Sequence, residues 1–259
     1  MSTERTVRPA WLPYVGDGPR SPTLICAPHA GGGTSVFSSW RAKSGEPEVS
    51  GTAHLNVQPL RLPARETRFR EPATGGYPEM AAAIVQEMAD LGADGDLVLL
   101  GSCSGALLAF EIARLLPQER VAALIVTSHR APSLTFPPPR GEEVHTMDSD
   151  RFWTRVAEYG GIPEQIIEDA ELREVYEPPL RGDWQAAEEY VLGSPTILAA
   201  PIFAIRGTRD DKVSRSDIDG WGVHTSSEFS SFEVDGDHMI IPQIHDLVFE
   251  LAAGAIGEK

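Results

Sequence analysis

The sequence predicts an α/β fold in which a mostly parallel central sheet is covered by helices. Two observations support this prediction. Short, continuous apolar runs recur along the chain, and segments with helical spacing separate most of them. Continuous apolar runs are typical of strands buried on both faces, as in a parallel sheet. The alternation of apolar runs with helical segments also indicates a parallel sheet, because parallel strands need crossover connections that are usually helices.

The expected elements follow in order along the chain. The strand-like runs lie at residues 23–27, 55–60, 96–100, 121–127, 201–205 and 231–234. Helices are expected at residues 38–42, 77–91, 105–116 and 241–255. Residues 1–20 are polar and rich in Pro and Gly, and we expect them to form a loose lead-in.

The alternation of strands and helices is interrupted at about residues 131–195. This stretch begins with a proline-rich linker that includes PPPR at 137–140, and it continues as polar helical segments at 148–159, 163–176 and 181–190. A helical insertion between two strands of a sheet is typical of a lid. We therefore predict a single domain over residues 1–259 with a lid insertion at about 131–195.

Composition narrows the class of protein. The chain has 259 residues, of which 41% are hydrophobic, enough for one sizeable core. Its net charge of −16 argues against nonspecific binding to nucleic acid or anionic membranes. We find no apolar run of roughly 18 residues and no secretory h-region. Two cysteines make no disulfide framework, so we expect a cytoplasmic protein. A monomer is the default expectation for its oligomeric state. No zinc-type or nucleotide-binding motif is visible.

The run GSCSG, residues 101–105, matches the G-x-S-x-G nucleophile elbow with cysteine at its centre. The elbow needs a strand before it and a helix after it, and the sequence predicts both. Cys103 is then the candidate nucleophile. The alternative is a tight strand-to-helix turn that holds a buried cysteine, since free cysteines are usually core residues.

Two later stretches favour the catalytic interpretation. The turn after residues 201–205 carries Asp210 and Asp211, and the turn after 231–234 carries His238. The order nucleophile, acid, histidine is that of α/β-hydrolases. We therefore predict a triad of Cys103, Asp210 and His238, with Asp211 as the second candidate for the acid. His224 and His245 are expected at the surface or in packing contacts.

The chemistry assigns a role to each member. His238 would deprotonate Cys103 or pair with its thiolate, and Asp210 would orient the imidazole and offset its positive charge. The oxyanion hole needs a second backbone N–H from a loop after an early strand. The sequence HAGGG, residues 29–33, supplies such a loop. We predict Ala30 and Ser104 as donors, with His29 and Gly31 supporting the loop. A plain flexible turn is the alternative.

Five segments carry a resemblance to the stand-alone type II thioesterases of polyketide and nonribosomal peptide biosynthesis. They are LICAPHAGGG (24–33), VQPLRLPARE (57–66), GSCSGALLAFEIAR (101–114), SHRAP (128–132) and DGDHMI (235–240). These resemble the family's F-P-H-A-G-G, V-Q-x-P-G-R-E, G-H-S-M-G-A-x-x-A-F-E-x-A-R, S-x-R-A-P and G-G-H-F-x-L segments. The resemblance covers about residues 10–255.

The resemblance implies an α/β-hydrolase that acts on acyl groups carried by the phosphopantetheine arm of acyl or peptidyl carrier proteins, without a metal or organic cofactor. The sequence departs from the family pattern at several positions. Cys103 stands where the family has serine, Ser102 where it has histidine, and Ala64 where it has glycine. RGTRD at 206–210 loses the first acid of G-G-D-x-D and leaves Asp210 at the catalytic position.

A cysteine nucleophile leaves two reactions open. An acyl-cysteine is itself a thioester, so its formation from a carrier thioester is nearly isoenergetic and reversible. Hydrolysis of the intermediate is expected from the family, and transfer of an acyl or aminoacyl group to a second carrier is the alternative. Some proteins that resemble this one are aminoacyl shuttles with cysteine at the elbow. A non-catalytic module that binds carriers is a third, less favoured reading.

Two further groups of residues are candidates for substrate contact. Arg61, Arg65 and Arg68, in the arginine-dense stretch up to Arg70, could bind the pantetheine phosphate or an acidic carrier helix. The alternative is a solvated loop whose arginines pair with Glu66 and Glu71. One or two aromatics of the insertion are expected to line an acyl channel and the others to form its core; the candidates are Phe152, Trp153, Tyr159, Tyr176, Trp184 and Tyr190.

Overall fold

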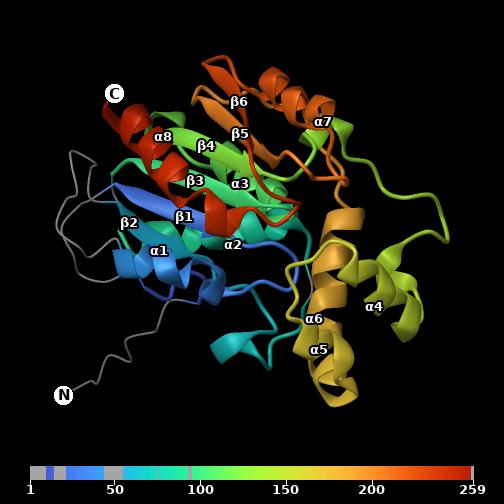
Figure 1. The fold of residues 1–259 in the computed structure, drawn as a ribbon. Helices are drawn as coiled ribbons and strands as arrows, with labels where there is room; N and C mark the ends of the chain where they lie inside the picture. The colour runs from blue at the N-terminus through green and yellow to red at the C-terminus, as the bar shows by residue number, and fades with distance from the viewer. Residues whose placement is uncertain (1–9, 15–21, 44–54, 74, 93–94, 258–259) are drawn as a thin grey trace, which may run out of the picture.

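A six-stranded parallel sheet forms the centre of the structure, in the order β2-β1-β3-β4-β5-β6 (Figure 1). The computed structural model describes residues 10–14, 22–43, 55–73, 75–92 and 95–257. The strands are β1 (Thr23–Ala27), β2 (Asn56–Pro59), β3 (Leu97–Ser102), β4 (Val121–Thr127), β5 (Ile202–Gly207) and β6 (Phe229–Val234). All six expected strands form, each within a few residues of its predicted bounds, and every pair in the sheet is parallel.

The continuous apolar strands are explained by burial on both faces of the sheet. Side chains alternate along each strand, so Ile25 and Leu99 belong to one core cluster while Leu24 and Leu100 belong to another. Helices α2 (Tyr77–Asp90), α3 (Gly105–Leu115) and α7 (Arg215–Asp219) contribute to the first cluster. Helices α1 (Ser38–Lys43) and α8 (His245–Gly257) contribute to the second.

The segment between β4 and β5 lies beside the sheet rather than on a face of it (Figure 1). We call residues 131–195 the insertion. It contains α4 (Ser149–Ala157), α5 (Glu164–Glu168) and α6 (Ala170–Glu188). Its own core is small and built from both α4 and α6: Val144, Phe152, Trp153, Val156 and Leu180.

Two expectations for the helices of the insertion were wrong. The predicted helices at 163–176 and 181–190 are instead the short α5 and one long α6, which continues through Pro178 and Pro179. Proline normally ends a helix because it lacks an N–H and clashes with the preceding turn. In α6 the Asp169 side chain caps the start, and burial of Leu180 and Asp183 after the prolines holds the second half.

The described part of the lead-in is also ordered against the core. The backbone N–H groups of Ala10, Trp11 and Leu12 donate to the Glu87 carboxylate at 2.7–2.9 Å, and the Leu12 side chain is buried. The expected loose lead-in is therefore wrong for residues 10–14, and the rest of residues 1–20 lies outside the described residues. In the part of the chain that is described, no helix has the length and apolar character needed to span a membrane.

Candidate active site

The turn between β3 and α3 places Cys103 in a strained conformation at the carboxyl end of the sheet. Its φ is +50°, in the left-handed region that a residue with a side chain rarely adopts. The flanking glycines make this turn possible. A Cβ at Gly101 would overlap Ala106, and one at Gly105 would overlap the carbonyl of Pro28. The cysteine side chain is half-buried and lines a cavity.

His238 lies between Cys103 and Asp210. Its Nε2 is 3.2 Å from Cys103 Sγ, and its Nδ1 is 3.0 Å from Asp210 Oδ2. His238 follows β6 and Asp210 follows β5, so three separate strand ends supply the three side chains. Both His238 and Asp210 are buried. The three side chains are hydrogen-bonded in the order that the predicted triad requires.

The electrostatics keep the proton on His238. Burial disfavours the imidazolium, but hydrogen bonds and charge interactions with Asp210 and Cys103 prevail and raise the pKa of His238 to about 10. For Asp210, burial acts to raise the pKa, but the His238 hydrogen bond and charge and the N–H groups of Lys212 and Val213 lower it overall. The site therefore favours a carboxylate–imidazolium arrangement beside the sulfur.

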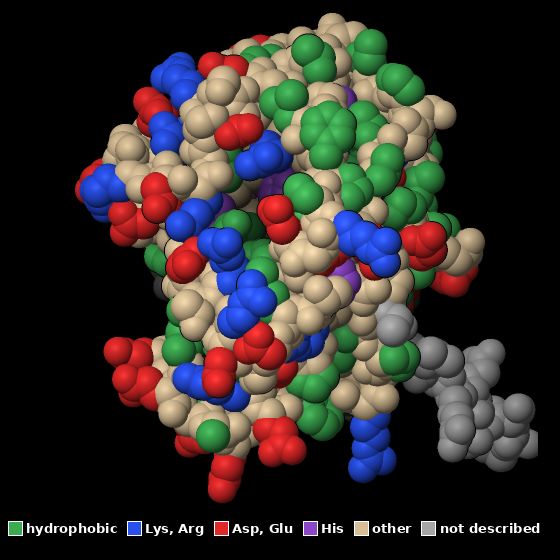
Figure 2. Space-filling model, turned by 90° about the vertical axis from the view of Figure 1, so that its right-hand side faces the viewer, with side chains coloured by type: hydrophobic (Ala, Val, Ile, Leu, Met, Phe, Trp, Pro, Cys, Tyr) green, Lys and Arg blue, Asp and Glu red, His purple; other side chains and the backbone are tan. Residues whose placement is uncertain are grey.

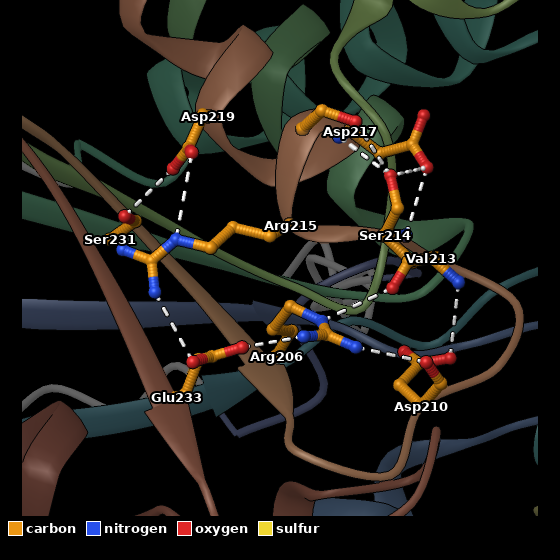
Figure 3. A network of polar contacts seen from close by, with 10 residues as sticks. Arg206, Asp210, Val213, Ser214, Arg215, Asp217, Asp219, Ser231 and Glu233 are labelled. Atoms are coloured by element: carbon orange, nitrogen blue, oxygen red, sulfur yellow. Dashed lines mark hydrogen bonds and ion pairs between the residues drawn. The ribbon is translucent and has the colours of Figure 1, made fainter.

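Arg206 on β5 holds the loop that presents Asp210 (Figure 3). It donates from Nη2 to the Asp210 carbonyl at 2.9 Å and from Nε to the Val213 carbonyl at 3.1 Å, and it pairs with Glu233 on β6. The carboxylate of Asp210 accepts hydrogen bonds from the backbone N–H groups of Lys212 and Val213 in the same loop. Sequence reasoning missed this role of Arg206, since nothing in the RGTRD motif alone indicates which carbonyls an arginine will bind.

The second candidate for the acid does not reach the histidine. The Asp211 side chain is 78% exposed and its carboxylate lies 3.3 Å from Lys212 Nζ. The two histidines that competed with His238 in the sequence, His224 and His245, make packing contacts. The ring of His224 packs edge-on against Phe110, and that of His245 stacks on Phe249.

The two predicted oxyanion donors lie at the same cavity. Ala30 and Ser104 both line it together with Cys103. Within the described residues, neither the Ala30 nor the Ser104 amide has a hydrogen-bond partner, whereas the amide of Cys103 donates to Thr127 at 2.9 Å. Two unpaired N–H groups next to a nucleophile are what an oxyanion hole requires.

The predicted supports of the oxyanion loop both contact the insertion. The buried ring of His29 lies against Gly161, whose backbone hydrogen-bonds it; burial lowers the pKa of His29. Gly31 has a φ of +77°, and its N–H donates to Asp183 Oδ2 on α6 at 2.7 Å. Asp183 was not singled out from the sequence, where it is one acid among many on a polar helix.

The structure corrects the expected carrier contact for Arg65 and Arg68. Arg65 pairs with Asp183 at 2.6 Å, and only 11% of its side chain is exposed. Arg68 is buried, pairs with Glu71 at 2.6 Å and stacks over the Trp11 ring. Arg61 donates from Nε to the Ala10 carbonyl at 3.0 Å. The guanidinium groups of Arg65 and Arg68 are thus paired with acids of the protein itself and present little charge to a partner, whereas Arg61 is half-buried. Of the alternative pairings, Glu71 applies and Glu66 does not, because Glu66 accepts from Thr34.

The cavity at Cys103 has a volume of about 550 Å³ and is lined largely by the insertion. Of the six aromatics considered, Tyr159 and Trp184 line it; their rings are 5.0 Å apart, and Tyr159 is 5.4 Å from the His238 ring. Phe152 and Trp153 form the core of the insertion. The Tyr190 hydroxyl donates to Glu111, and Tyr176 is exposed.

Cations lie at the mouth of this cavity. On the face that carries the insertion, Lys and Arg side chains gather around a hollow in which histidine is visible (Figure 2). The cationic lining residues are Arg130, Arg155 and Lys212. No cluster of His, Cys, Asp and Glu suited to a metal ion occurs among the residues that the structure describes.

Comparison with known proteins agrees with this geometry. The family model of the thioesterase domain matches residues 22–252. The chain is 32% identical over 249 residues to thioesterase PikA5 of Streptomyces venezuelae, covering 93% of this chain and 84% of that protein. It superposes on the type II thioesterase BorB from the borrelidin biosynthetic cluster with a TM-score of 0.81 and 27% identity, covering 95% and 98% of the two chains. YbtT, a type II thioesterase from the yersiniabactin NRPS/PKS pathway, gives a TM-score of 0.75 at 26% identity, with 93% and 96% covered.

Proposed function

The chain belongs to the thioesterase family, and from this premise we propose that it hydrolyses acyl or aminoacyl thioesters of carrier proteins through an acyl-Cys103 intermediate. Its relatives are type II thioesterases of polyketide and nonribosomal peptide pathways. One observation supports the chemistry above all others. His238 is hydrogen-bonded at once to Cys103 Sγ and to the Asp210 carboxylate, at the wall of a cavity.

The proposed reaction has two steps. The Cys103 thiolate attacks the thioester carbonyl, and the oxyanion that forms accepts the N–H groups of Ala30 and Ser104. The new C–S bond to Cys103 remains when the bond to the pantetheine sulfur breaks, and the departing thiolate takes the proton of His238. A water molecule then attacks the acyl-cysteine while His238 accepts its proton. The acid leaves, and the proton left on His238 restores the thiolate–imidazolium pair.

The sulfur at position 103 favours a second reaction at the same site. Exchange of one thioester for another changes the free energy little, so a pantetheine thiol on a second carrier can replace water in the second step. The product is then an acylated second carrier, and the enzyme is a shuttle. The raised pKa of His238 supports either outcome, because a retained imidazolium stabilises a cysteine thiolate as nucleophile and as leaving group.

The experiment that tests the function is intact-protein mass spectrometry with an acylated carrier protein and an excess of a second, empty holo-carrier. We expect a transient mass increase at Cys103, followed by free acid. Loading of the second carrier with little free acid would instead establish transfer. Cys103→Ala should abolish the mass increase and the turnover.

Cys26 provides a matched control, because it is the other cysteine and lies buried in the sheet. Cys26→Ala should retain the acyl-enzyme. Turnover by Cys103→Ala without an acyl-enzyme would refute covalent catalysis at this residue. Binding of the acylated carrier by the wild-type protein with neither acylation nor turnover would favour a non-catalytic carrier-binding module.

A further inference from the structure

A single carboxylate of the insertion fixes the loop that carries the predicted oxyanion donor. Asp183 on α6 accepts the Gly31 N–H at 2.7 Å through Oδ2 and pairs with Arg65 at 2.6 Å through Oδ1. The same guanidinium donates from Nη1 to the Gly32 carbonyl at 2.7 Å. The Asp183–Arg65 pair therefore binds the backbone of the loop on both sides of the peptide that joins Gly31 and Gly32.

This loop needs external support because of its composition. Three successive glycines, Gly31 to Gly33, give the backbone more freedom than any other residue type, and Gly31 adopts a left-handed φ of +77°. The Gly31 N–H belongs to the peptide that begins at Ala30. Fixing that N–H limits rotation of the Ala30 backbone, and hence the direction of the Ala30 amide.

Packing links the same loop to the same helix. A Cβ at Gly31 would lie 2.9 Å from Leu180 Cδ1 and 3.0 Å from Ile162 Cδ1, so side chains of the insertion close over the glycine. Leu180 precedes Asp183 by one helical turn on α6. The carboxylate and the guanidinium are about nine-tenths buried, where an ion pair is screened little by solvent.

From these contacts we propose that Asp183 is a positioning residue for catalysis. It acts with Arg65 to hold the Ala30 amide toward the reacting carbonyl, and the oxyanion hole is complete only while α6 is seated on the loop. The insertion then has a direct part in the chemistry as well as in forming the cavity. The inference rests on the proposed function, because it assigns the Ala30 amide to an acyl-transfer step at Cys103.

The test compares two reactions of the same sulfur. Acylation of Cys103 by a thioester needs an oxyanion hole, whereas alkylation by iodoacetamide needs only a reactive, accessible thiolate. For Asp183→Asn we expect the acylation rate constant to fall by about 100-fold, the loss typical of one oxyanion donor. KM should change by less than about threefold and the alkylation rate by less than about twofold.

Glu177 is a matched control on the same helix. It also binds several partners within the insertion, namely Arg181, Trp153 and Ser149, but it does not contact the oxyanion loop. Glu177→Gln should leave the ratio of acylation to alkylation as in the wild type. An equal fall of this ratio in both variants, or no fall in Asp183→Asn, would overturn the proposal.

A second variant keeps the test decisive if Asp183→Asn does not fold. Arg65→Lys retains a charge opposite Asp183 but cannot make the guanidinium's several directed bonds. It should show a smaller loss of acylation relative to alkylation than Asp183→Asn, about tenfold, because the charge is kept. An unchanged ratio would overturn the proposal. Failure of the proposed function looks different: the wild-type protein itself would form no acyl-Cys103, which would refute this inference as well.

Discussion

The protonation of His238 depends on its two hydrogen-bonded neighbours, chiefly on Asp210. Burial alone would strip the proton from His238, yet Asp210 and Cys103 raise the pKa of His238 to about 10, well above the ordinary value for histidine. The carboxylate acts through its bond of 3.0 Å to Nδ1. His238 is therefore protonated at neutral pH, and the charge of Asp210 is one reason for this.

Asp210→Asn should move this balance in a defined direction. Loss of the negative charge lowers the pKa of His238, so less imidazolium remains beside the Cys103 sulfur at neutral pH. Because the sulfur then has less positive charge beside it, we expect alkylation by iodoacetamide at pH 6–7 to slow by at least tenfold. An NMR titration of the His238 ring should show its proton lost at lower pH than in the wild type.

The neighbouring acid is the control for this experiment. Asp211 carries the same charge one residue away, but it is exposed and paired with Lys212. Asp211→Asn should leave both the alkylation rate and the titration of the His238 ring close to those of the wild type. Similar shifts in the two variants would mean that the general charge of the loop, rather than the Asp210–His238 bond, sets the pKa of His238.

At the scale of elements, the sheet and the elbow could be predicted because their signals are local. The strands β1 and β4 begin and end where the apolar runs do, and GSCSG has the glycines that its turn requires. The bounds of the helices in the insertion could not be predicted from such local signals. Pro178 and Pro179 favour a break, and only burial of α6 against α4 and the core, which sequence spacing does not reveal, carries the helix through them.

Helix α6 also shapes the cavity, which leads to a prediction about acyl groups. Ala187 lines the cavity together with Trp184, whereas Gln185 on the same helix is exposed and does not line it. Ala187→Leu adds three carbon atoms to the wall and should lower kcat/KM for long acyl thioesters about tenfold relative to acetyl thioesters. The measurement is kcat/KM over a series of chain lengths.

Gln185→Leu adds a similar apolar side chain away from the cavity and should leave the chain-length preference unaltered. If Ala187→Leu lowered activity equally for every chain length, the wall formed by α6 would not be where the acyl chain lies. A shift in Gln185→Leu would point to a general disturbance of the helix.

For the molecule as a whole, the sequence indicated three side chains that the structure brings together, but not the network around them. Chain order predicted Cys103, Asp210 and His238 because strand ends meet at one edge of a parallel sheet. The Arg65–Asp183 pair joins residues 118 positions apart, and no local pattern indicates it. The same limit explains the wrong assignment of the arginines, since a sequence shows where charge lies along the chain but not whether it is buried.

Exposed positive charge lies instead at the cavity that Cys103 lines. Arg130 and Arg155 line the cavity, and about half of each side chain is exposed. The protein as a whole carries −16, so an acidic partner is repelled in general and attracted only where cations gather. We therefore expect the double variant Arg130→Gln, Arg155→Gln to bind an acylated carrier less well.

The measurement is the ratio of kcat/KM for an acylated carrier to kcat/KM for the same acyl group on N-acetylcysteamine, which has neither phosphate nor carrier. This ratio should fall about fivefold to tenfold at low salt and recover at about 0.5 M salt, where the Debye length shortens to a few ångströms. Arg209 and Arg215 are exposed to a similar degree and pair with acids, as Arg155 does with Glu158, but they do not line the cavity. The double variant Arg209→Gln, Arg215→Gln is therefore the control of equal charge. An equal fall in the control would assign the effect to the net charge of the protein. A fall confined to the Arg130 and Arg155 variant would instead indicate a local contact, because the two double variants change the net charge equally.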